Sequence, residues 1–300
     1  MKHLFILNPA AGKYDRTGEF SQRIREICDK KGLHYEILVS RAPGDCTAIA
    51  QAAAATGEQL RIYACGGDGT LNEVVNGAAG YENAAVTNFP CGSGNDFIRN
   101  FSQPAAFSDL NRLVDGEVAE LDLIRCGKHY SINICSMGLD ARIGTSMSRY
   151  KHLPLVSGHG AYLLSTGVNL IKPLAHRYTV EIDGKVIEDE LTLICIANGS
   201  WYGGGFHSVP EARTDDGLLD ILLVKKLSRF QVAKVIGLYK AGRYREVPHL
   251  VTPYRGKKVR ILCRKPSEIN LDGELLMEQD ATFEVVPKGI RFFYPKGLTY

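Results

Sequence analysis

The chain has 300 residues, of which 45% are hydrophobic and 23% are charged. This composition excludes a disordered or fibrous protein, and the length favours two domains over one. The formal net charge of +3 is too small for a protein that binds nucleic acid through bulk positive charge. The charge is unevenly divided, since residues 1–122 hold 11 basic and 16 acidic side chains and the remainder holds 25 and 17. We interpret this asymmetry as a second half that faces an anionic surface, with chance as the alternative.

The first 122 residues alternate apolar strands with helical stretches and short loops, which is typical of an α/β unit with a parallel sheet. The sequence therefore predicts a Rossmann-like α/β domain over residues 1–122. The expected strands are 3–7, 35–39, 60–65 and 84–89, and the expected helices are 17–31, 46–56 and 71–79.

After Asp122 the pattern changes to strand-like runs, bounded by turn pairs such as Asp183-Gly184 and Asp272-Gly273. This pattern predicts a largely antiparallel β-sandwich domain over residues 123–287, and residues from about 288 to 300 are expected to return to the first domain. The expected strands are 130–135, 177–182, 191–197, 219–224, 257–262, 281–286 and 290–294, with helices at 161–171 and 229–243.

The cysteines and the first residues of the chain indicate in which cellular compartment the protein is expected. The eight cysteines are scattered without a Cys-x-x-Cys pair, and several lie in apolar runs. We therefore expect reduced thiols and a cytoplasmic protein. The first apolar stretch ends at Asn8-Pro9, too early for a secretory signal. No run of about 18 apolar residues predicts a membrane span, so any contact with lipid is expected to be peripheral.

The segment Cys65–Glu73 reads Cys-Gly-Gly-Asp-Gly-Thr-Leu-Asn-Glu, follows a hydrophobic strand and opens a helix. Backbone N–H groups and the dipole at such a helix start form an anion site, and the glycines let the backbone approach a polyphosphate. Asp68 is placed there to organise Mg²⁺ or its water. The alternative is a tight glycine turn in which Asp68 caps the helix.

Two other strands end in loops of small residues, at Asn8–Lys13 and at Pro90–Asp96. Because ligands of parallel sheets bind beyond the carboxyl ends of the strands, the three loops together predict a nucleotide triphosphate site. Lys13 and Arg16 are candidates for steering phosphates, or ordinary surface cations. The G-x-x-x-x-G-K-[ST] and G-x-G-x-x-G motifs are absent, as are the H-R-D and D-F-G motifs of protein kinases.

Taken together, these motifs resemble the diacylglycerol kinase catalytic family, the bacterial lipid kinases that are similar to sphingosine and ceramide kinases. The matching pieces run in order along the chain: Asn8–Gly12, Gly66–Thr70, Gly92–Asp96, Gly203–Gly205, Pro210 with Ala212, Asp215–Gly217 with Leu219-Asp220, and Asp272–Glu274. NAD kinases and phosphofructokinases share the Gly-Gly-Asp-Gly element, but their other motifs are not found here.

The resemblance implies a role for each matching residue. Glu274 would be the general base that takes the proton of the lipid hydroxyl, and Asp68 would hold the catalytic Mg²⁺ through water. Asp216, with the backbone carbonyls of Arg213 and Leu218, would bind a second, structural Mg²⁺. Family members often carry Thr where Ser93 stands, and Ser keeps the hydroxyl. The residues implied in ATP binding are Asn8, Ala10, Ala11, Gly12, Lys13, Tyr14, Ser40, Gly67, Asp68, Gly69, Thr70, Leu71, Asn72, Glu73 and Ser93.

The resemblance thus implies an ATP- and Mg²⁺-dependent kinase that phosphorylates a diacylglycerol-like lipid at the cytoplasmic face of the membrane. The alternatives are a kinase for a sphingoid, isoprenoid, glycolipid or NAD acceptor, and a regulatory protein that binds ATP without catalysis. The helical stretches 161–171 and 229–245 combine apolar and basic residues that suit an anionic interface or a solvated helix face. Trp201-Tyr202 could line the acceptor mouth, and a homodimer is a family-based expectation.

Overall fold

The computed structural model describes residues 1–92, 94–143, 168 and 172–300. The predicted helix at 161–171 therefore lies outside the described residues except for Val168. The described helices are α1 (Thr17–Lys31), α2 (Asp45–Ala54), α3 (Asp68–Ala78), α4 (Leu110–Val114) and α7 (Arg229–Lys240), with short 3₁₀ turns at Phe97–Asn100, Pro104–Ser108 and Tyr244–Glu246. The strands are β1 (Lys2–Leu7), β2 (Tyr35–Val39), β3 (Leu60–Gly66), β4 (Ala84–Pro90), β5 (Glu117–Cys126), β6 (His129–Ser131), β7 (Ile134–Gly138), β8 (His176–Ile182), β9 (Lys185–Ala197), β10 (Trp201–Tyr202), β11 (Phe206–His207), β12 (Leu219–Lys225), β13 (Val251–Gly256), β14 (Lys258–Leu271) and β15 (Glu274–Tyr294).

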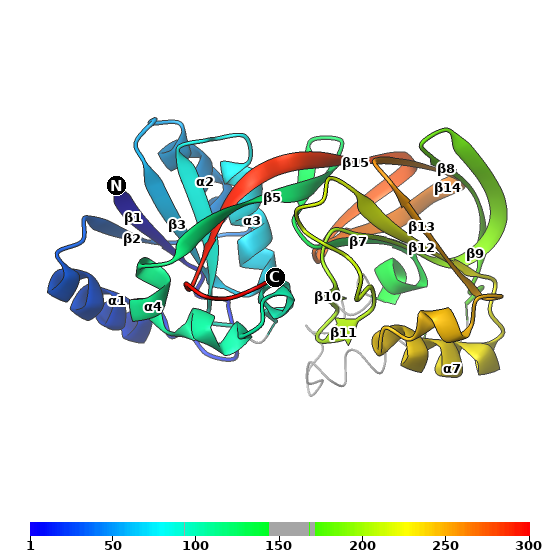
Figure 1. Ribbon diagram of the computed structural model, residues 1–300, viewed down its shortest axis with the longest axis horizontal. Helices are drawn as coiled ribbons and strands as arrows, with labels where there is room; N and C mark the ends of the chain where they lie inside the picture. The colour runs from blue at the N-terminus through cyan, green and yellow to red at the C-terminus, as the bar shows by residue number, and fades with distance from the viewer. Residues whose placement is uncertain (93, 144–167, 169–171) are drawn as a thin grey trace.

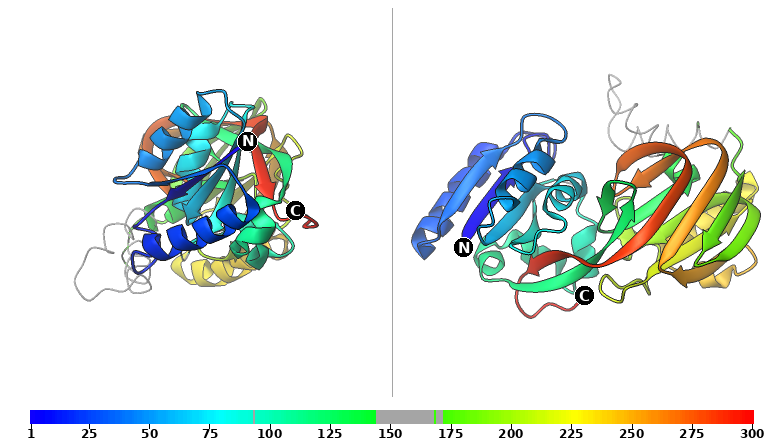
Figure 2. Two further views of the ribbon diagram at one scale, coloured as in Figure 1. Left: turned by 90° about the vertical axis from the view of Figure 1, so that its left-hand side faces the viewer. Right: turned by 90° about the horizontal axis from the view of Figure 1, so that it is seen from above.

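The N-terminal part is a mixed α/β domain. Its strands β2, β1, β3 and β4 pair in that order and are all parallel. Strands β1, β3 and β4 are buried almost throughout, as in parallel sheets whose two faces are both covered, whereas the edge strand β2 is only partly buried. Helices α2 and α3 cover one face, and α1 and α4 lie on the other (Figures 1 and 2). Strand β2 pairs on one side of β1, and β3 and β4 continue the sheet on the other side. The strand order therefore reverses at β1, and the switch point of the sheet lies beside the carboxyl end of that strand.

The C-terminal part is an antiparallel β domain. Strands β13, β12, β9 and β7 pair antiparallel in that order, and β7 pairs with β14. One buried cluster lies among the strands, and a second lies under α7 (Figure 1). Helix α7 starts at a capping box between Ser228 and Gln231 and buries Val232, Val235 and Tyr239. None of the helices among the described residues is long and apolar enough to cross a membrane.

The hairpins at Asp183-Gly184 and Asp272-Gly273 have the predicted two-residue turns. Both residues of each turn have positive φ, at 46° and 86° in the first and 50° and 99° in the second. Such turns match the twist of the strands that they join, which explains the Asp-Gly sequence.

The strand predictions differ from the structure in two places. Residues 130–135 were expected as one strand, but they are divided between β6 and β7, with a bend at Ile132 and Asn133. Residues 281–286 and 290–294 were expected as two strands, but they belong to the single strand β15, which has 21 residues. Its register shifts between Val286 and Ile290, where the pairing with β5 is interrupted. Strands β15 and β5 run side by side from the β-rich part into the N-terminal domain (Figures 1 and 2). There β15 pairs parallel with β4 through Arg291 and Phe292, and residues 290–298 contribute to the N-terminal core.

All eight cysteines are unpaired, and all but Cys91 are buried. Burial raises the pKa of the Cys28, Cys46 and Cys126 thiols to about 11. Their thiols are therefore protonated at neutral pH and act as small core side chains.

Candidate active site

Three glycine-containing loops meet beyond the carboxyl ends of β1, β3 and β4, as the sequence predicted. The Asn8 side-chain amide donates to the Thr70 hydroxyl over 3.0 Å, which joins the first loop to the start of α3. The Asp68 N–H donates to the Gly94 carbonyl over 3.0 Å, and the Cys91 N–H donates to the Gly66 carbonyl over 3.1 Å. These bonds hold the three loops in one fixed arrangement.

Glycine is required where the loops cross. A Cβ atom at Gly67 would lie 2.6 Å from the Gly94 carbonyl oxygen, and one at Gly66 would lie 2.1 Å from the Thr70 hydroxyl. A side chain at Gly67 would displace the Gly94 backbone, and one at Gly66 would collide with the Thr70 side chain in the first turn of α3. Gly67 thus brings backbone against backbone at the start of α3.

Asp68 is the first residue of α3, and its carboxylate reaches back to the loop after β4. It accepts the Asp96 N–H at 2.8 and 2.9 Å and the Phe97 N–H at 3.1 Å. Burial raises the pKa of Asp68 to about 6, and the carboxylates of Asp96 and Asp272 add to the rise against the backbone hydrogen bonds. Negative charge is therefore concentrated here, where a bound cation would stabilise the ionised form.

The turn between β14 and β15 lies against α3. The Asp272 carboxylate accepts the N–H groups of Ile132 and Ile134 at 2.7 and 2.8 Å, and the Asn72 side-chain amide at 3.3 Å. Burial raises the pKa of Asp272, while its hydrogen bonds oppose the shift. These contacts fix the turn that carries Glu274.

Glu274 begins β15 and is exposed. The surrounding protein nevertheless desolvates its carboxylate enough to raise the pKa, and the nearby Glu73 carboxylate raises it further. Glu73 lies on α3 and accepts the Cys46 N–H at 3.1 Å. The structure thus brings Glu274 to the same helix that begins with Asp68, although the two are more than 200 residues apart in sequence.

Of the other residues predicted to bind ATP, some are exposed and some are buried. Lys13 and Tyr14 are exposed beyond β1, with the Lys13 ammonium 5.2 Å from the centre of the Tyr14 ring. Ser40 is buried, and its N–H donates to the Leu7 carbonyl at 2.9 Å. The Leu71 side chain is only 1% exposed and lies in the core, so only its backbone remains for a ligand. Ser93 lies outside the described residues.

The predicted second metal site is arranged around ion pairs. The Asp216 carboxylate accepts the Leu218 N–H at 3.1 Å and pairs with the Arg255 guanidinium, which also contacts Asp220 at 3.0 Å. Arg213 pairs instead with Asp215 at 3.2 Å. Among the described residues, no group of three or more His, Cys, Asp or Glu side chains could hold a metal ion. Arg255 supplies the positive charge beside Asp216 in this structure, and a second metal held by Asp216 and backbone carbonyls stays a prediction.

Two buried carboxylates that tie distant loops together, Asp96 and Asp122, were not among the predicted residues. Asp96 accepts the Gly204 N–H at 2.6 Å and pairs with Arg99 at 3.2 Å, which ties the loop after β4 to the Gly203–Gly205 loop. Asp122 accepts the Gly217 and Lys288 N–H groups at 2.7 and 2.8 Å. Asp96 ends a glycine-rich motif and could have been found from it, whereas the partners of Asp122 are too distant in sequence to be inferred.

The chain matches two family models in sequence order. Residues 2–126 match the diacylglycerol kinase catalytic domain, and residues 133–294 match the YegS C-terminal NAD kinase beta sandwich-like domain. The glycine loops lie in the first match and the Asp272–Glu274 turn lies in the second.

Similar proteins cover almost the whole chain. A diacylglycerol kinase of Staphylococcus carnosus (strain TM300) is 26% identical over 299 residues, which are 98% of this chain and 95% of that protein. A diacylglycerol kinase of Staphylococcus epidermidis (strain ATCC 12228 / FDA PCI 1200) is 27% identical over 295 residues, with 98% and 92% covered. The crystal structure of a diacylglycerol kinase from Bacillus anthracis str. Sterne has a TM-score of 0.70 at 23% identity and covers 98% of this chain and 97% of that chain. This last likeness shows the fold.

Proposed function

Because the chain belongs to the diacylglycerol kinase catalytic family, we propose that it transfers the γ-phosphate of ATP to the hydroxyl of diacylglycerol and so forms phosphatidic acid. The observation that carries the proposal is the meeting of two parts of the chain at α3. The glycine loops lie at the start of this helix, and the Asp272–Glu274 turn is held against its side by Asn72. Phosphoryl transfer needs a donor and a base side by side, and this arrangement supplies both.

The loops after β1, β3 and β4 form the donor site in this proposal. The start of α3 presents backbone N–H groups and the positive end of the helix dipole, which favour phosphate. Gly67 and Gly94 keep the backbone free of side chains there, and Lys13 lies nearby on the exposed loop. ATP is the phosphoryl donor that the kinase family implies.

The Asp68 carboxylate fits a catalytic Mg²⁺. Magnesium prefers oxygen ligands and is held by one or two carboxylates together with waters and substrate phosphates, so a cage of protein ligands is not needed. Asp68 is fixed by backbone N–H groups and has Asp96 and Asp272 near it, so a cation would offset the burial and the repulsion that raise its pKa. The ion would neutralise charge on the transferred phosphate.

Glu274 is the general base of the proposed reaction. Its carboxylate would accept the proton of the lipid hydroxyl as the oxygen attacks the γ-phosphorus. Its raised pKa makes it a stronger base than an ordinary glutamate, and its exposure leaves it open to a substrate. Asp272 does not compete for this role, because N–H groups and the Asn72 amide surround its carboxylate.

We further propose that the enzyme works at the cytoplasmic face of the membrane through peripheral contact. Helix α7 supports this, since its buried side anchors it while Phe230 is 91% exposed beside the exposed Lys234. An exposed aromatic residue beside cations suits an anionic lipid surface. Flotation with phosphatidylglycerol vesicles tests it: added salt or Lys234→Glu should weaken binding, and salt-insensitive binding would refute an electrostatic contact.

The test of the activity is a transfer assay with labelled ATP and Mg²⁺ and with diacylglycerol, sphingosine, an isoprenoid alcohol and a glycolipid in mixed micelles, and NAD in solution. Labelled phosphatidic acid is the expected product. A labelled product from another acceptor would reassign the substrate while keeping the kinase. Binding of ATP without transfer to any acceptor would favour a regulatory ATP-binding protein and reject the proposed catalysis.

A further inference from the structure

A cavity lies in the β domain, away from the candidate active site. It has a volume of about 520 Å³ and is lined by residues at the end of β7, at the start of β8 and in the middle of β14. Glu268 lines this pocket, whereas Asp272 lies four residues further along the chain. Four residues of extended strand span about 13 Å, so the pocket and the turn are separate places on β14.

The pocket exists because β14 changes its partner. Residues 259–263 pair with β8, and residues 269–271 pair with β7, while the register against β15 shifts between Leu262 and Ser267. The strand edge at 264–268 is therefore left without a neighbour on the pocket side. Pro266 lies in this stretch, where its missing N–H costs no sheet hydrogen bond. A break in the sheet, with a fixed backbone on both sides, forms the floor of the cavity.

The lining is strongly basic. It contains five cations, Arg142, Lys172, Arg177, Arg264 and Lys265, and one carboxylate, Glu268. Arg177 pairs with Glu188 outside the pocket. Within the part of the chain that the structure describes, no carboxylate forms an ion pair with Lys172, Arg264 or Lys265. Lysines and arginines elsewhere on the β domain pair with carboxylates on neighbouring strands or loops. The three cations Lys172, Arg264 and Lys265 differ from them in having no carboxylate partner among the described residues.

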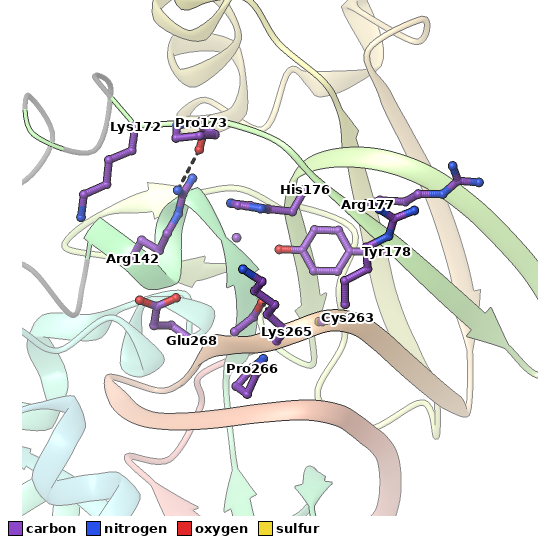
Figure 3. A pocket seen from close by; sticks show the side chains of 13 residues that line it. Arg142, Lys172, Pro173, His176, Arg177, Tyr178, Cys263, Lys265, Pro266 and Glu268 are labelled. Atoms are coloured by element: carbon purple, nitrogen blue, oxygen red, sulfur yellow. Dashed lines mark hydrogen bonds between the residues drawn. The ribbon is translucent and has the colours of Figure 1, made fainter.

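The side chains are arranged to meet a ligand. Figure 3 shows the Tyr178 hydroxyl, the His176 ring and the Lys265 ammonium turned toward the middle of the pocket. The Arg142 guanidinium donates to the Pro173 carbonyl at 2.8 Å and to the Leu174 carbonyl at 3.3 Å, which fixes the segment before β8 (Figure 3). Tyr178 is buried, which raises the pKa of its hydroxyl to about 12, so the hydroxyl stays protonated at neutral pH and can donate a hydrogen bond.

We propose that this pocket binds a phosphate ester anion. Cations with a hydroxyl donor are the groups that recognise phosphate, and a single carboxylate leaves the site net positive. The apolar parts of Pro173, Pro266 and Tyr178 beside them suit the glycerol end of a phospholipid headgroup. The shared chemistry is that of glycerol phosphate, whether free in solution or at the head of an anionic lipid. This binding does not depend on the proposed kinase activity.

The experiment measures binding to the full chain by calorimetry, without ATP. The probes are sn-glycerol 3-phosphate, dihexanoyl phosphatidylglycerol below its micelle concentration, and uncharged dihexanoylglycerol. Lys265→Ala and Arg264→Ala should each weaken binding of the anionic probes about tenfold. Glu268→Gln should strengthen it, a gain that a damaged fold cannot produce. Lys257→Ala removes one exposed cation of the same domain outside the pocket and should leave binding unchanged.

The probes also identify the source of the ligand. Equal binding of glycerol phosphate and the short-chain lipid supports a soluble phosphate ester, and binding of the lipid alone supports a membrane headgroup. Binding of the uncharged lipid that Lys265→Ala and Arg264→Ala weaken as much as they weaken binding of the anionic probes overturns the proposal. The same affinity for the anionic probes in Lys265→Ala and Lys257→Ala also overturns it. So does the absence of binding by both anionic probes at millimolar concentration.

Discussion

The Asn72 side-chain amide donates to the Asp272 carboxylate across 3.3 Å, although 200 residues separate them in sequence. The same amide also donates to the Tyr130 carbonyl at 3.1 Å. One buried side chain on α3 thereby holds both β6 and the turn that carries Glu274. Asn72 is also predicted as an ATP contact, and its hydrogen bonds in the structure add a positioning role.

We predict that Asn72→Ala lowers kcat about tenfold while KM for ATP changes little. The turn keeps its backbone hydrogen bonds but loses its tie to α3, and small displacements of a catalytic group are costly. Steady-state kinetics with varied ATP and lipid measures both constants. Asn111→Ala, on the exposed surface of α4, is the control. A rise in KM for ATP with unchanged kcat would assign Asn72 to nucleotide binding.

Glu274→Gln is expected to lower kcat by about 10²–10⁴, the range for loss of a general base. The amide keeps the shape of the side chain but cannot accept the proton. Glu278→Gln, further along β15 and also exposed, makes the same change outside the site and should retain activity. Comparable loss in both variants would mean that charge on the strand matters and that Glu274 is not the base.

The Asp68 carboxylate should set an acid limb in the pH profile. Its pKa of about 6 predicts that kcat/KM for ATP falls as pH drops through that value, because the neutral acid cannot hold a cation. Asp96→Asn removes a negative neighbour and so favours ionised Asp68, which moves the limb to lower pH. The profile is measured from pH 5 to 8. A limb that stays in place in Asp96→Asn would show that another group titrates.

Gly67→Ala should disturb the donor site. The new methyl group would lie 2.6 Å from the Gly94 carbonyl oxygen, so the loop after β4 must move. We expect a several-fold rise in KM for ATP and a loss of about 1–3 kcal/mol in unfolding free energy. Gly18→Ala, in the first turn of α1, is the matched control, because a Cβ atom there meets no atom within 4 Å. Nucleotide titration and denaturant unfolding measure the two effects, and equal behaviour of the variants would contradict the close approach.

His3 should make stability depend on pH. The ring is buried, its Nδ1 lies 2.7 Å from the Tyr63 hydroxyl, and burial with the nearby Arg61 lowers its pKa to about 4. The unfolded chain binds this proton near pH 6.5, so stability falls as pH drops from about 6.5 to 4. Relative to His3→Gln, the native chain should lose about 3 kcal/mol over that window. Parallel stability curves for the two proteins would show that His3 keeps an ordinary pKa.

The parts of the site that could be predicted are those whose local structure depends on a short segment of sequence. Gly66, Gly67 and Asp68 follow an apolar strand and open a helix, and Asp272-Gly273 has the sequence of a two-residue hairpin turn. Both local structures are confirmed. That these two segments lie side by side could not be predicted from the hydrophobic periodicity of the sequence, because their contact depends on Asn72 and on backbone groups of β7.

Pairing between strands that are distant in sequence accounts for other differences between the predicted and the observed structure. Residues 281–294 contain a break in the apolar pattern, which suggested two strands, but pairing with β5 and β14 maintains one strand through it. The partnership of Arg255 with Asp216 and Asp220 joins neighbouring strands whose register was unknown from sequence. The basic pocket likewise arises from the change of partner along β14, which leaves no local signature.

Strand β15 places the last part of the N-terminal core at the end of the chain. Phe292 and Phe293 are completely buried in that core, next to strands made from the first hundred residues. During synthesis the edge of β4 must therefore stay uncovered until β15, which follows the whole β domain in sequence, has left the ribosome. The N-terminal domain is thus expected to complete its core only after the β domain has been made, and the open edge of β4 is exposed to wrong pairing until then.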